Sequence, residues 1–128
     1  MLFRSLICDS YFDADFGSGY DCAISTYSLH HFSEADKLKL YQKTRAALEP
    51  GSLFVLGDYT VDTMERQQAL IAENDRLRGE NGIADRAFYH FDTPFTAEVE
   101  INLLKSAGFI DAKCVRQWES TSIITARA

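Results

Sequence analysis

Residues 25–32 contain the densest group of hydroxyl and imidazole side chains in the chain, with the sequence Ser-Thr-Tyr-Ser-Leu-His-His-Phe. A serine followed by histidines is compatible with a hydrolase, but a nucleophile elbow needs a glycine on each side of the serine, and this segment has none. Adjacent histidines rarely point at one ion, so His30, His31 and His90 predict no metal site. The structural alternative is that one of the paired histidines packs inside the fold while the other is exposed.

Other polar side chains follow short apolar runs. Asp9 comes directly after the first run, and Asp58 comes directly after the most apolar run in the chain. Ligands bind beyond the carboxyl ends of the strands in an open parallel sheet. Residues 9–11, 25–31 and 58–59 are therefore the candidates for a functional site.

The segments that must position these candidates alternate between strand-like and helix-like patterns, which is typical of an α/β sheet. Strands are predicted at residues 2–8, 21–25, 52–58, 110–118 and 121–127. The last two have so short a link that they should form an antiparallel hairpin. We expect a single α/β domain over residues 1–128, with a Rossmann-like sheet of about five strands that is mostly parallel and closes with this hairpin.

Three helices are predicted between these strands. Ser33 is predicted to cap a helix that stops at Pro50-Gly51, and Thr96 to cap a helix that ends at Gly108. The segment at about 62–78 has a thin apolar stripe, which predicts a helix that covers another part of the fold rather than forming its core. With the loop that follows, it makes a helical insertion at about 62–96.

The composition indicates one globular domain, because 128 residues with 46% hydrophobic and 25% charged side chains are enough for a core. A net charge of −6 argues against a nucleic-acid-binding protein. We see no apolar run long enough for a membrane span and no export signal, so no membrane partner is expected. Three separated cysteines encode neither a disulfide framework nor a zinc motif and indicate buried thiols, with the cytoplasm as the expected compartment.

Several short segments occur in a characteristic order along the chain. They are residues 20–25 (YDCAIS), 29–32 (LHHF), 48–54 (LEPGSLF), Asp58, 89–96 (YHFDTPFT) and 103–109 (LLKSAGF). This ordered set resembles the second half of the class I S-adenosylmethionine-dependent methyltransferases, and the resemblance covers essentially the whole chain. It implies methyl transfer from S-adenosylmethionine to a small-molecule acceptor.

The resemblance also implies which residues approach the cofactor. Asp9 and Ser10 match the loop whose carboxylate and next backbone N–H bind the adenine, and a carboxylate suits the exocyclic amine because it accepts hydrogen bonds. The alternative is that Asp9 only caps a turn. Ser25 and Thr26 match the strand end at which the backbone approaches the methionine part and the transferable methyl group.

The acceptor side follows from the same match. Tyr27, Leu29 and His30 would border the acceptor pocket, and Tyr89 and His90 would close over the substrate, with loop packing as the alternative for the last two. Holding donor and acceptor close together supplies much of the acceleration of an in-line methyl transfer. A general base is needed only if the nucleophile arrives protonated, and His30 is the candidate catalytic residue.

The chain also departs from the family. The family begins with a strand, a Gly-rich turn, a helix and a second strand that ends in an acidic ribose ligand, and this chain has none of them. The chain therefore resembles a truncated, incomplete methyltransferase. The alternative is a non-catalytic remnant that oligomerises or binds a partner. We expect residues 2–8 either to fill the vacant slot beside the strand at 21–25 or to pair across a homodimer that covers the exposed sheet edge.

Overall fold

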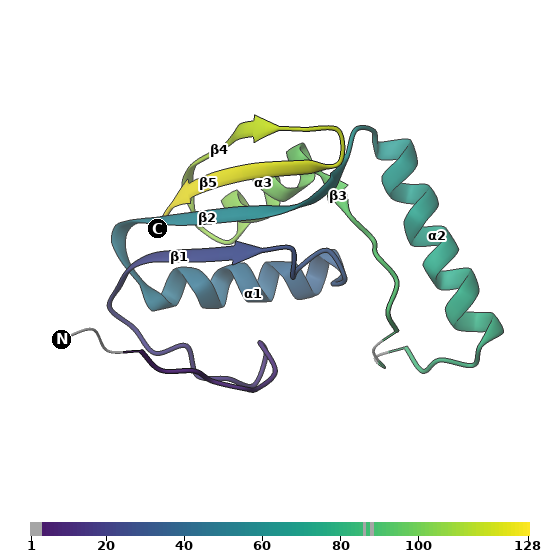
Figure 1. The fold of residues 1–128 in the computed structure, drawn as a ribbon, viewed down its shortest axis with the longest axis horizontal. Coiled ribbons are helices and arrows are strands. Elements are labelled where there is room, and N and C mark those ends of the chain that lie inside the picture. The colour runs from purple at the N-terminus through teal and green to yellow at the C-terminus, as the bar shows by residue number, and fades with distance from the viewer. Residues whose placement is uncertain (1–3, 86, 88) are drawn as a thin grey trace.

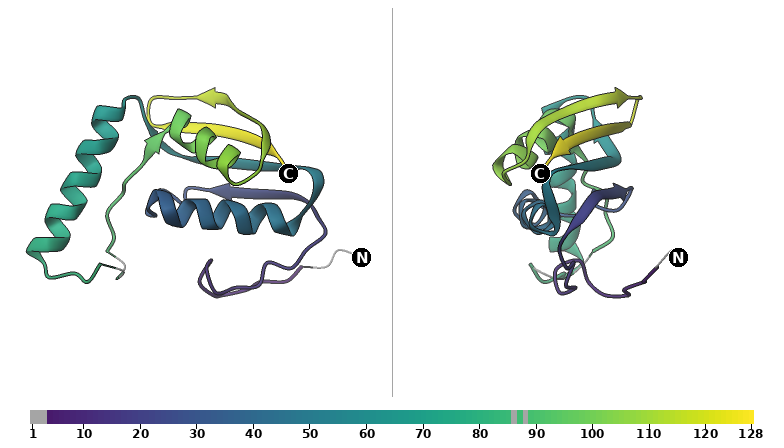
Figure 2. Two further views of the ribbon diagram at one scale, coloured as in Figure 1. Left: turned by 180° about the vertical axis from the view of Figure 1, so that it is seen from behind. Right: turned by 90° about the vertical axis from the view of Figure 1, so that its left-hand side faces the viewer.

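A computed structural model describes residues 4–85, 87 and 89–128 of the chain. Five strands form one sheet, and α1 and α3 lie together on one of its faces (Figures 1 and 2). The elements in chain order are β1 (Tyr20–Thr26), α1 (Glu34–Ala47), β2 (Leu48–Val61), α2 (Met64–Glu80), β3 (Phe95–Thr96), α3 (Ala97–Ser106), β4 (Ile110–Gln117) and β5 (Thr121–Arg127).

The sheet has the order β1-β2-β5-β4, with the two-residue β3 paired to β2 beyond this path. β1 and β3 run parallel to β2, whereas β5 runs antiparallel to both of its neighbours, β2 and β4. The predicted α/β fold and the C-terminal hairpin are confirmed, but the expectation of a mostly parallel sheet is wrong. The reason is that β5 inserts between β4 and the central strand, so one reversed strand makes two antiparallel pairings.

The helix caps form as the sequence predicts. The Ser33 hydroxyl accepts the N–H of Asp36, and the Thr96 hydroxyl accepts the N–H of Val99. The first helix ends at Ala47, before Pro50-Gly51, because the chain passes directly from α1 into β2. β2 is consequently twice the predicted length, and residues 48–51 join the strand.

The core lies between the sheet and the two helices on its covered face. Its most buried side chains come from α1, β2, α3 and β5, and they include Leu40, Tyr41, Phe54, Leu56, Leu104 and Ile124. Strand alternation sends the neighbouring residues Ile24, Val55 and Ile123 to the opposite face, over which no described helix lies. Ile24 is 70% exposed there.

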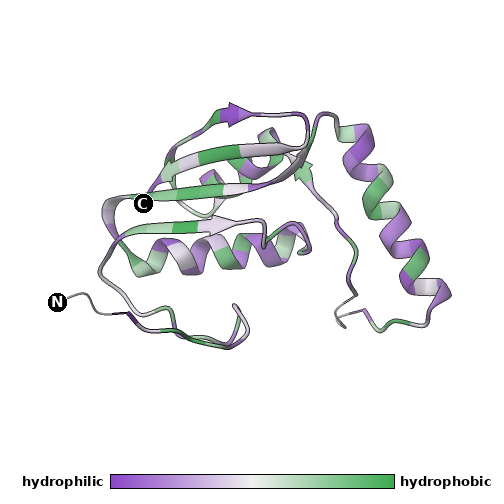
Figure 3. Cartoon of the chain, viewed as in Figure 1, coloured by the Kyte–Doolittle hydropathy of each residue, from purple (hydrophilic) through white to green (hydrophobic). Residues whose placement is uncertain are grey.

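The helix α2 projects away from the sheet and exposes a mostly hydrophilic surface (Figures 1 and 3). Gln67 is its one buried residue, and the Gln67 side-chain oxygen accepts the N–H of Thr96 at 2.8 Å. This bond ties the base of α2 to the start of α3, so the helix is an arm rather than a cover for the core. Neither α2 nor any other helix in the described part of the chain is long and apolar enough to cross a membrane.

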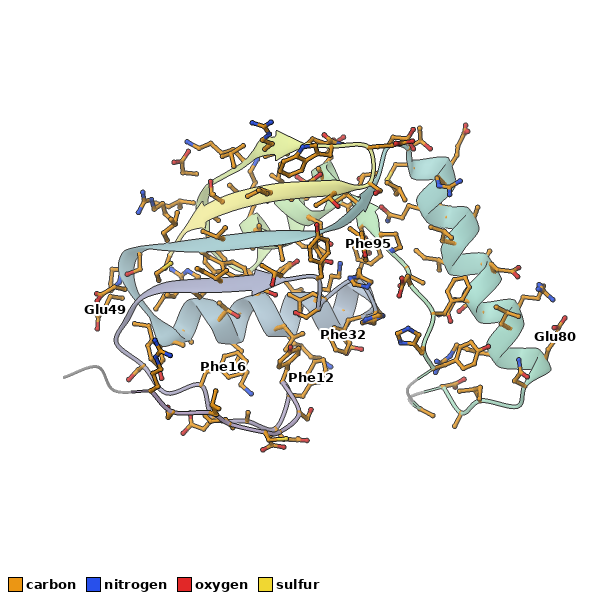
Figure 4. The ribbon with its side chains drawn as sticks, in the orientation of Figure 1. Phe12, Phe16, Phe32, Glu49, Glu80 and Phe95 are labelled. Atoms are coloured by element: carbon orange, nitrogen blue, oxygen red, sulfur yellow. The ribbon has the colours of Figure 1, made fainter. Side chains whose placement is uncertain are left out.

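The N-terminal segment corrects a prediction. Residues 4–8 form no strand, and Leu6 is 99% exposed; Leu2 and Phe3 lie outside the described residues. The segment is instead held against α1 and the turn before it. The ring of Phe12 packs edge-on against Phe32 of that turn with centroids 5.4 Å apart (Figure 4), and Lys43 of α1 donates to the backbone oxygen of Phe12. Residues 4–8 therefore do not fill the slot beside β1, and the outer edge of β1 pairs with no described strand.

The cysteines also differ from expectation. Cys8 and Cys22 are exposed and Cys114 is partly exposed, so the expectation of buried thiols is wrong. Cys8 lies in the unpaired N-terminal segment, and Cys22 alternates with Ala23 onto the uncovered face of β1. All three are free thiols.

Candidate active site

His30 is fixed just beyond the end of β1, which pairs with β2 up to Gly57. After Thr26 the backbone turns sharply through Tyr27, whose φ is +48°, and the N–H of Tyr27 donates to the carbonyl of Gly57 at 2.8 Å. This turn carries the next residues across β2 at Asp58, which directly follows the apolar run of that strand. The Asp58 carboxylate accepts from Leu29 N at 3.1 Å and lies 2.6 Å from His30 Nδ1.

The His30–Asp58 pair is buried, with 3% and 2% of each residue exposed. Asp58 also accepts the N–H of Tyr59 at 2.8 Å, so its two oxygens are held by backbone donors as well as by the imidazole. Because a carboxylate only accepts hydrogen bonds, the proton of a neutral His30 ring lies on Nδ1. This leaves the lone pair of Nε2 pointing away from Asp58.

The far side of the imidazole faces a segment from elsewhere in the chain. His30 Nε2 lies 3.4 Å from Asp92 Oδ1, and His31 Nδ1 lies 3.1 Å from the same oxygen. The Thr93 N–H donates to the carbonyl of His30 at 2.9 Å, which holds residues 89–94 in place. Burial, together with the neighbouring His30, lowers the pKa of His31. Of the adjacent histidines, which were expected to be one packed and one exposed, His30 is packed, but His31 is partly buried rather than exposed, with its ring turned toward Asp92.

Two clefts are lined by residues next to His30 or in contact with it. One has a volume of about 590 Å³, runs along the free edge of β1, and is lined at the strand end by Ser25, Thr26 and Leu29. The other has a volume of about 650 Å³ and is lined by Tyr59 and Asp92, together with residues from the start of α2 and the β4–β5 turn. His30 lines neither cleft itself, but its neighbour Leu29 lines the first, and Asp92, which contacts its imidazole, lines the second.

The residues predicted to bind the cofactor fall into two places. Ser25 and Thr26 lie at the end of β1 beside the first cleft, and the Ser25 hydroxyl is 3.1 Å from that of Ser28. Asp9 and Ser10 are exposed in the N-terminal segment, and the Asp9 carboxylate accepts the N–H of Ser10 at 2.7 Å. In this arrangement Asp9 caps its own turn, and neither residue lines the cleft that holds Ser25.

The residues predicted to border the acceptor are also divided. The Tyr27 ring is half exposed and lies 4.9 Å from that of Tyr59, which lines the second cleft, but Tyr27 itself lines neither cleft. Leu29 turns its side chain into the core and contributes its backbone to Asp58. Tyr89 is partly buried, and the exposed His90 has its ring 5.0 Å from that of His31. The structure thus groups His90 with the histidine pair.

Two residues of this site were not assigned roles from the sequence. Asp58 was among the residues beyond a predicted strand, and its place after the most apolar run was the signal that could have identified it as the partner of His30. Asp92 gave no comparable signal, because 62 residues separate it from His30 and nothing local indicates that the segment folds back.

No protein-family profile matches the chain, and no curated protein matches its sequence. Solved structures do match. The methyltransferase SibL, described as S-adenosylmethionine-dependent, has a TM-score of 0.68 at 22% identity, covering 94% of this chain and 34% of SibL. Human N-acetylserotonin methyltransferase, in complex with S-adenosylmethionine, has a TM-score of 0.65 at 19% identity, covering 93% of this chain and 32% of that protein.

A third similar structure is an O-methyltransferase family 2 protein from Planctomyces limnophilus in complex with apigenin, with a TM-score of 0.65 at 12% identity. The match covers 93% of this chain and 33% of that protein. The resemblance to the methyltransferases is therefore confirmed at the level of the fold. The chain spans about a third of the length of these proteins.

Proposed function

We propose that this chain forms the acceptor-activating part of an S-adenosylmethionine-dependent methyltransferase that acts on a hydroxyl group of a small molecule. The observation that carries the proposal is the buried pair in which His30 Nδ1 lies 2.6 Å from Asp58 Oδ1. A hydroxyl oxygen becomes a strong nucleophile when its proton is removed, so this reaction calls for a base. An imidazole held by a carboxylate, with its second nitrogen beside Asp92 at the lining of the second cleft, is such a base.

S-adenosylmethionine supplies, when bound, an electrophilic methyl group on a sulfonium. His30 Nε2 would accept the proton of the acceptor hydroxyl as the oxygen forms its bond to the methyl carbon and the methyl–sulfur bond breaks, which leaves S-adenosylhomocysteine. Asp58 keeps the ring in the required tautomer and stabilises the positive charge that the ring gains. Tyr59, whose ring lies 4.7 Å from that of His30, restricts the position of the acceptor in the second cleft.

The residues of this chain fit one side of the cofactor. The first cleft has a hydroxyl pair, Ser25 and Ser28, at its strand end, and the open edge of β1 beside them lets a ligand approach the backbone. These groups suit the methionine part and the methyl group, as Thr26 does at the same strand end. The adenine and ribose require further donors and an acidic ligand. We propose that a part of the protein other than these residues supplies these donors and the acidic ligand. Asp9 and Ser10 would contribute on the adenine side after their turn rearranges.

The uncovered face of the sheet supports a second part of the proposal, that the chain forms a homodimer. Ile24 is 70% exposed on this face, and the edge of β1 beside it offers free backbone donors and acceptors. A second copy of the chain that covers this face and this edge would remove Ile24 and the backbone groups of β1 from water. The three free thiols support a reducing compartment, and we propose the cytoplasm.

Cofactor binding and methyl transfer test this function together. The mass of the chain in solution is measured first, and S-adenosylmethionine and S-adenosylhomocysteine are then titrated by calorimetry. Methyl transfer to apigenin and to other hydroxylated aromatic molecules is followed with methyl-labelled S-adenosylmethionine. We expect His30→Gln to reduce transfer about 10²–10⁴-fold while cofactor binding is unchanged.

Asp58→Asn should reduce transfer as well, because an amide stabilises the charged ring less than a carboxylate does. Glu73→Gln, on the exposed arm, is the matched control and should leave transfer unchanged. Absence of binding at millimolar cofactor would exclude methyl transfer by this chain alone and favour a non-catalytic remnant that binds a partner. Equal transfer by His30→Gln and the unaltered chain would exclude His30 as the base.

A further inference from the structure

The side of His30 that faces away from Asp58 belongs to a cluster of three side chains. His30 Nε2, His31 Nδ1 and Asp92 Oδ1 all lie within 4.8 Å of one another. Two of these atoms come from the turn after β1 and the third comes from residues 89–94, which return from the arm to β3. The cluster therefore forms only when the two segments are held together, as they are by the bond from Thr93 N to the carbonyl of His30.

Two of the three separations match those between ligands of a small ion, and the third, between the two histidine nitrogens, is below 4.8 Å. Two ligand atoms about 2.0–2.1 Å from a tetrahedral zinc ion lie about 3.3–3.4 Å from each other. The observed separations are 3.4 Å from His30 Nε2 to Asp92 Oδ1 and 3.1 Å from His31 Nδ1 to the same oxygen. Two imidazoles and one carboxylate are also a ligand set that zinc takes, with a fourth position left for water.

The hydrogen bonding of His30 supports the same conclusion. Asp58 binds Nδ1, so in the neutral ring the lone pair of Nε2 faces the oxygen of Asp92, and two acceptors in this position repel each other unless a proton or a metal cation lies between them. Histidine ligands of metals commonly donate their other ring N–H to a carboxylate, which fixes the tautomer and makes the ligand more basic. Asp58 is the carboxylate that binds the other ring nitrogen, Nδ1, of His30.

We propose that His30, His31 and Asp92 form a binding site for a divalent transition metal ion of the zinc type. Binding of the ion uses the Nε2 lone pair of His30, so the same atom does not accept a proton while the ion is present. The metal site is inferred from its geometry alone, but its expected effect on methyl transfer rests on the proposed function. Zinc inhibits methyl transfer, and a chelator restores it.

The test measures metal binding directly on the full chain. Cys8, Cys22 and Cys114 are changed to serine so that thiols do not bind the ion, and circular dichroism checks the fold. Zn²⁺ is titrated in competition with a chromophoric chelator. We expect one ion per chain with a dissociation constant of about 1 μM or lower, since three protein ligands and a carboxylate behind His30 hold it.

Variants then test the ligand set. His31→Gln and Asp92→Asn should each weaken zinc binding about 30-fold or more, and Asp58→Asn about 10–100-fold through its contact with His30. His90→Gln is the matched control, because His90 lies beside His31 but outside the three-atom cluster, and it should change the affinity less than about threefold. Co²⁺ should give the visible absorption of a tetrahedral site with nitrogen and oxygen ligands.

Three results would overturn the proposal: fewer than one ion for every ten chains, a dissociation constant above about 100 μM, or an equal loss in His90→Gln and His31→Gln. These readouts do not depend on catalysis. If the chain binds zinc but does not transfer methyl groups, the metal site is supported and the proposed function is contradicted. A chain that transfers methyl groups equally well with and without zinc would show that the ion does not occupy His30 Nε2.

Discussion

Replacing Glu100 with glutamine (Glu100→Gln) is expected to destabilise the fold by about 3–5 kcal/mol, because it leaves the ammonium of Lys37 buried without a countercharge. Glu100 lies on α3 and is 1% exposed, while Lys37 and Tyr41 lie on α1 and are fully buried. One oxygen of Glu100 binds Lys37 Nζ and the other accepts the Tyr41 hydroxyl. The three groups therefore join the two helices that cover the sheet.

The magnitude follows from what each group loses. A domain of this size has a total stability of about 5–15 kcal/mol, so the loss of one buried partner removes a large share of it. The Lys37 ammonium also lies 4.3 Å from the centre of the Phe95 ring, a contact that offsets only about 0.5–2 kcal/mol. Burial, followed by the charge of Glu100, raises the pKa of Tyr41 well above its usual value, so Tyr41 stays a hydrogen-bond donor.

The double variant Lys37→Met/Glu100→Gln separates charge from packing. The amide oxygen still accepts from Tyr41, and methionine packs on Phe95 without a buried charge, so we expect stability within about 1.5 kcal/mol of the unaltered chain. Urea unfolding followed by circular dichroism measures each variant. Lys113→Met is the control, because the pair of Lys113 with Asp111 is exposed and 3.5 Å long, and it should change stability by less than about 0.5 kcal/mol. A cost below about 1 kcal/mol for Glu100→Gln would refute the reasoning.

Substitutions at three further positions test single features of the fold. Ser33→Ala removes the N-cap of α1 and should cost about 1 kcal/mol in urea unfolding, whereas Ser33→Asp should cost almost nothing. Gly108→Ala should cost more than about 1 kcal/mol, because φ is +99° and the new methyl group would lie 3.1 Å from the Nε of Arg45; an unchanged midpoint would contradict this. The hydrogen bond from Arg76 lowers the pKa of Glu73 in the folded chain below its unfolded value of about 4.3. The pairing of Glu73 with Arg76 therefore stabilises α2 at pH values above the unfolded pKa of Glu73, and this stabilisation is lost as the pH falls through the folded pKa. The helicity of Arg76→Gln and that of the unaltered chain should consequently become equal in acid.

The sequence determined the elements and one half of the site. Ser33 and Thr96 begin helices because each hydroxyl reaches a backbone N–H three residues ahead, and this contact needs nothing from the rest of the chain. The hairpin of β4 and β5 follows from the short link between two strand-like runs. His30 was a candidate because it follows a strand, and Asp58 stood in the equivalent position after the next one. All of these are patterns within a few residues.

The tertiary structure decided the rest. The place of β5 between β4 and β2 depends on which strand pairing buries the most apolar surface, and no local pattern encodes that comparison. Residues 4–8 read as a strand because they are apolar, yet the packing of Phe12 on Phe32 holds this segment away from β1. Asp92 meets His30 only because the chain returns from α2 to pair β3 with β2. A contact between residues so far apart in the chain is stabilised by the whole fold, and for that reason the sequence alone placed the histidines but not the carboxylate that they share.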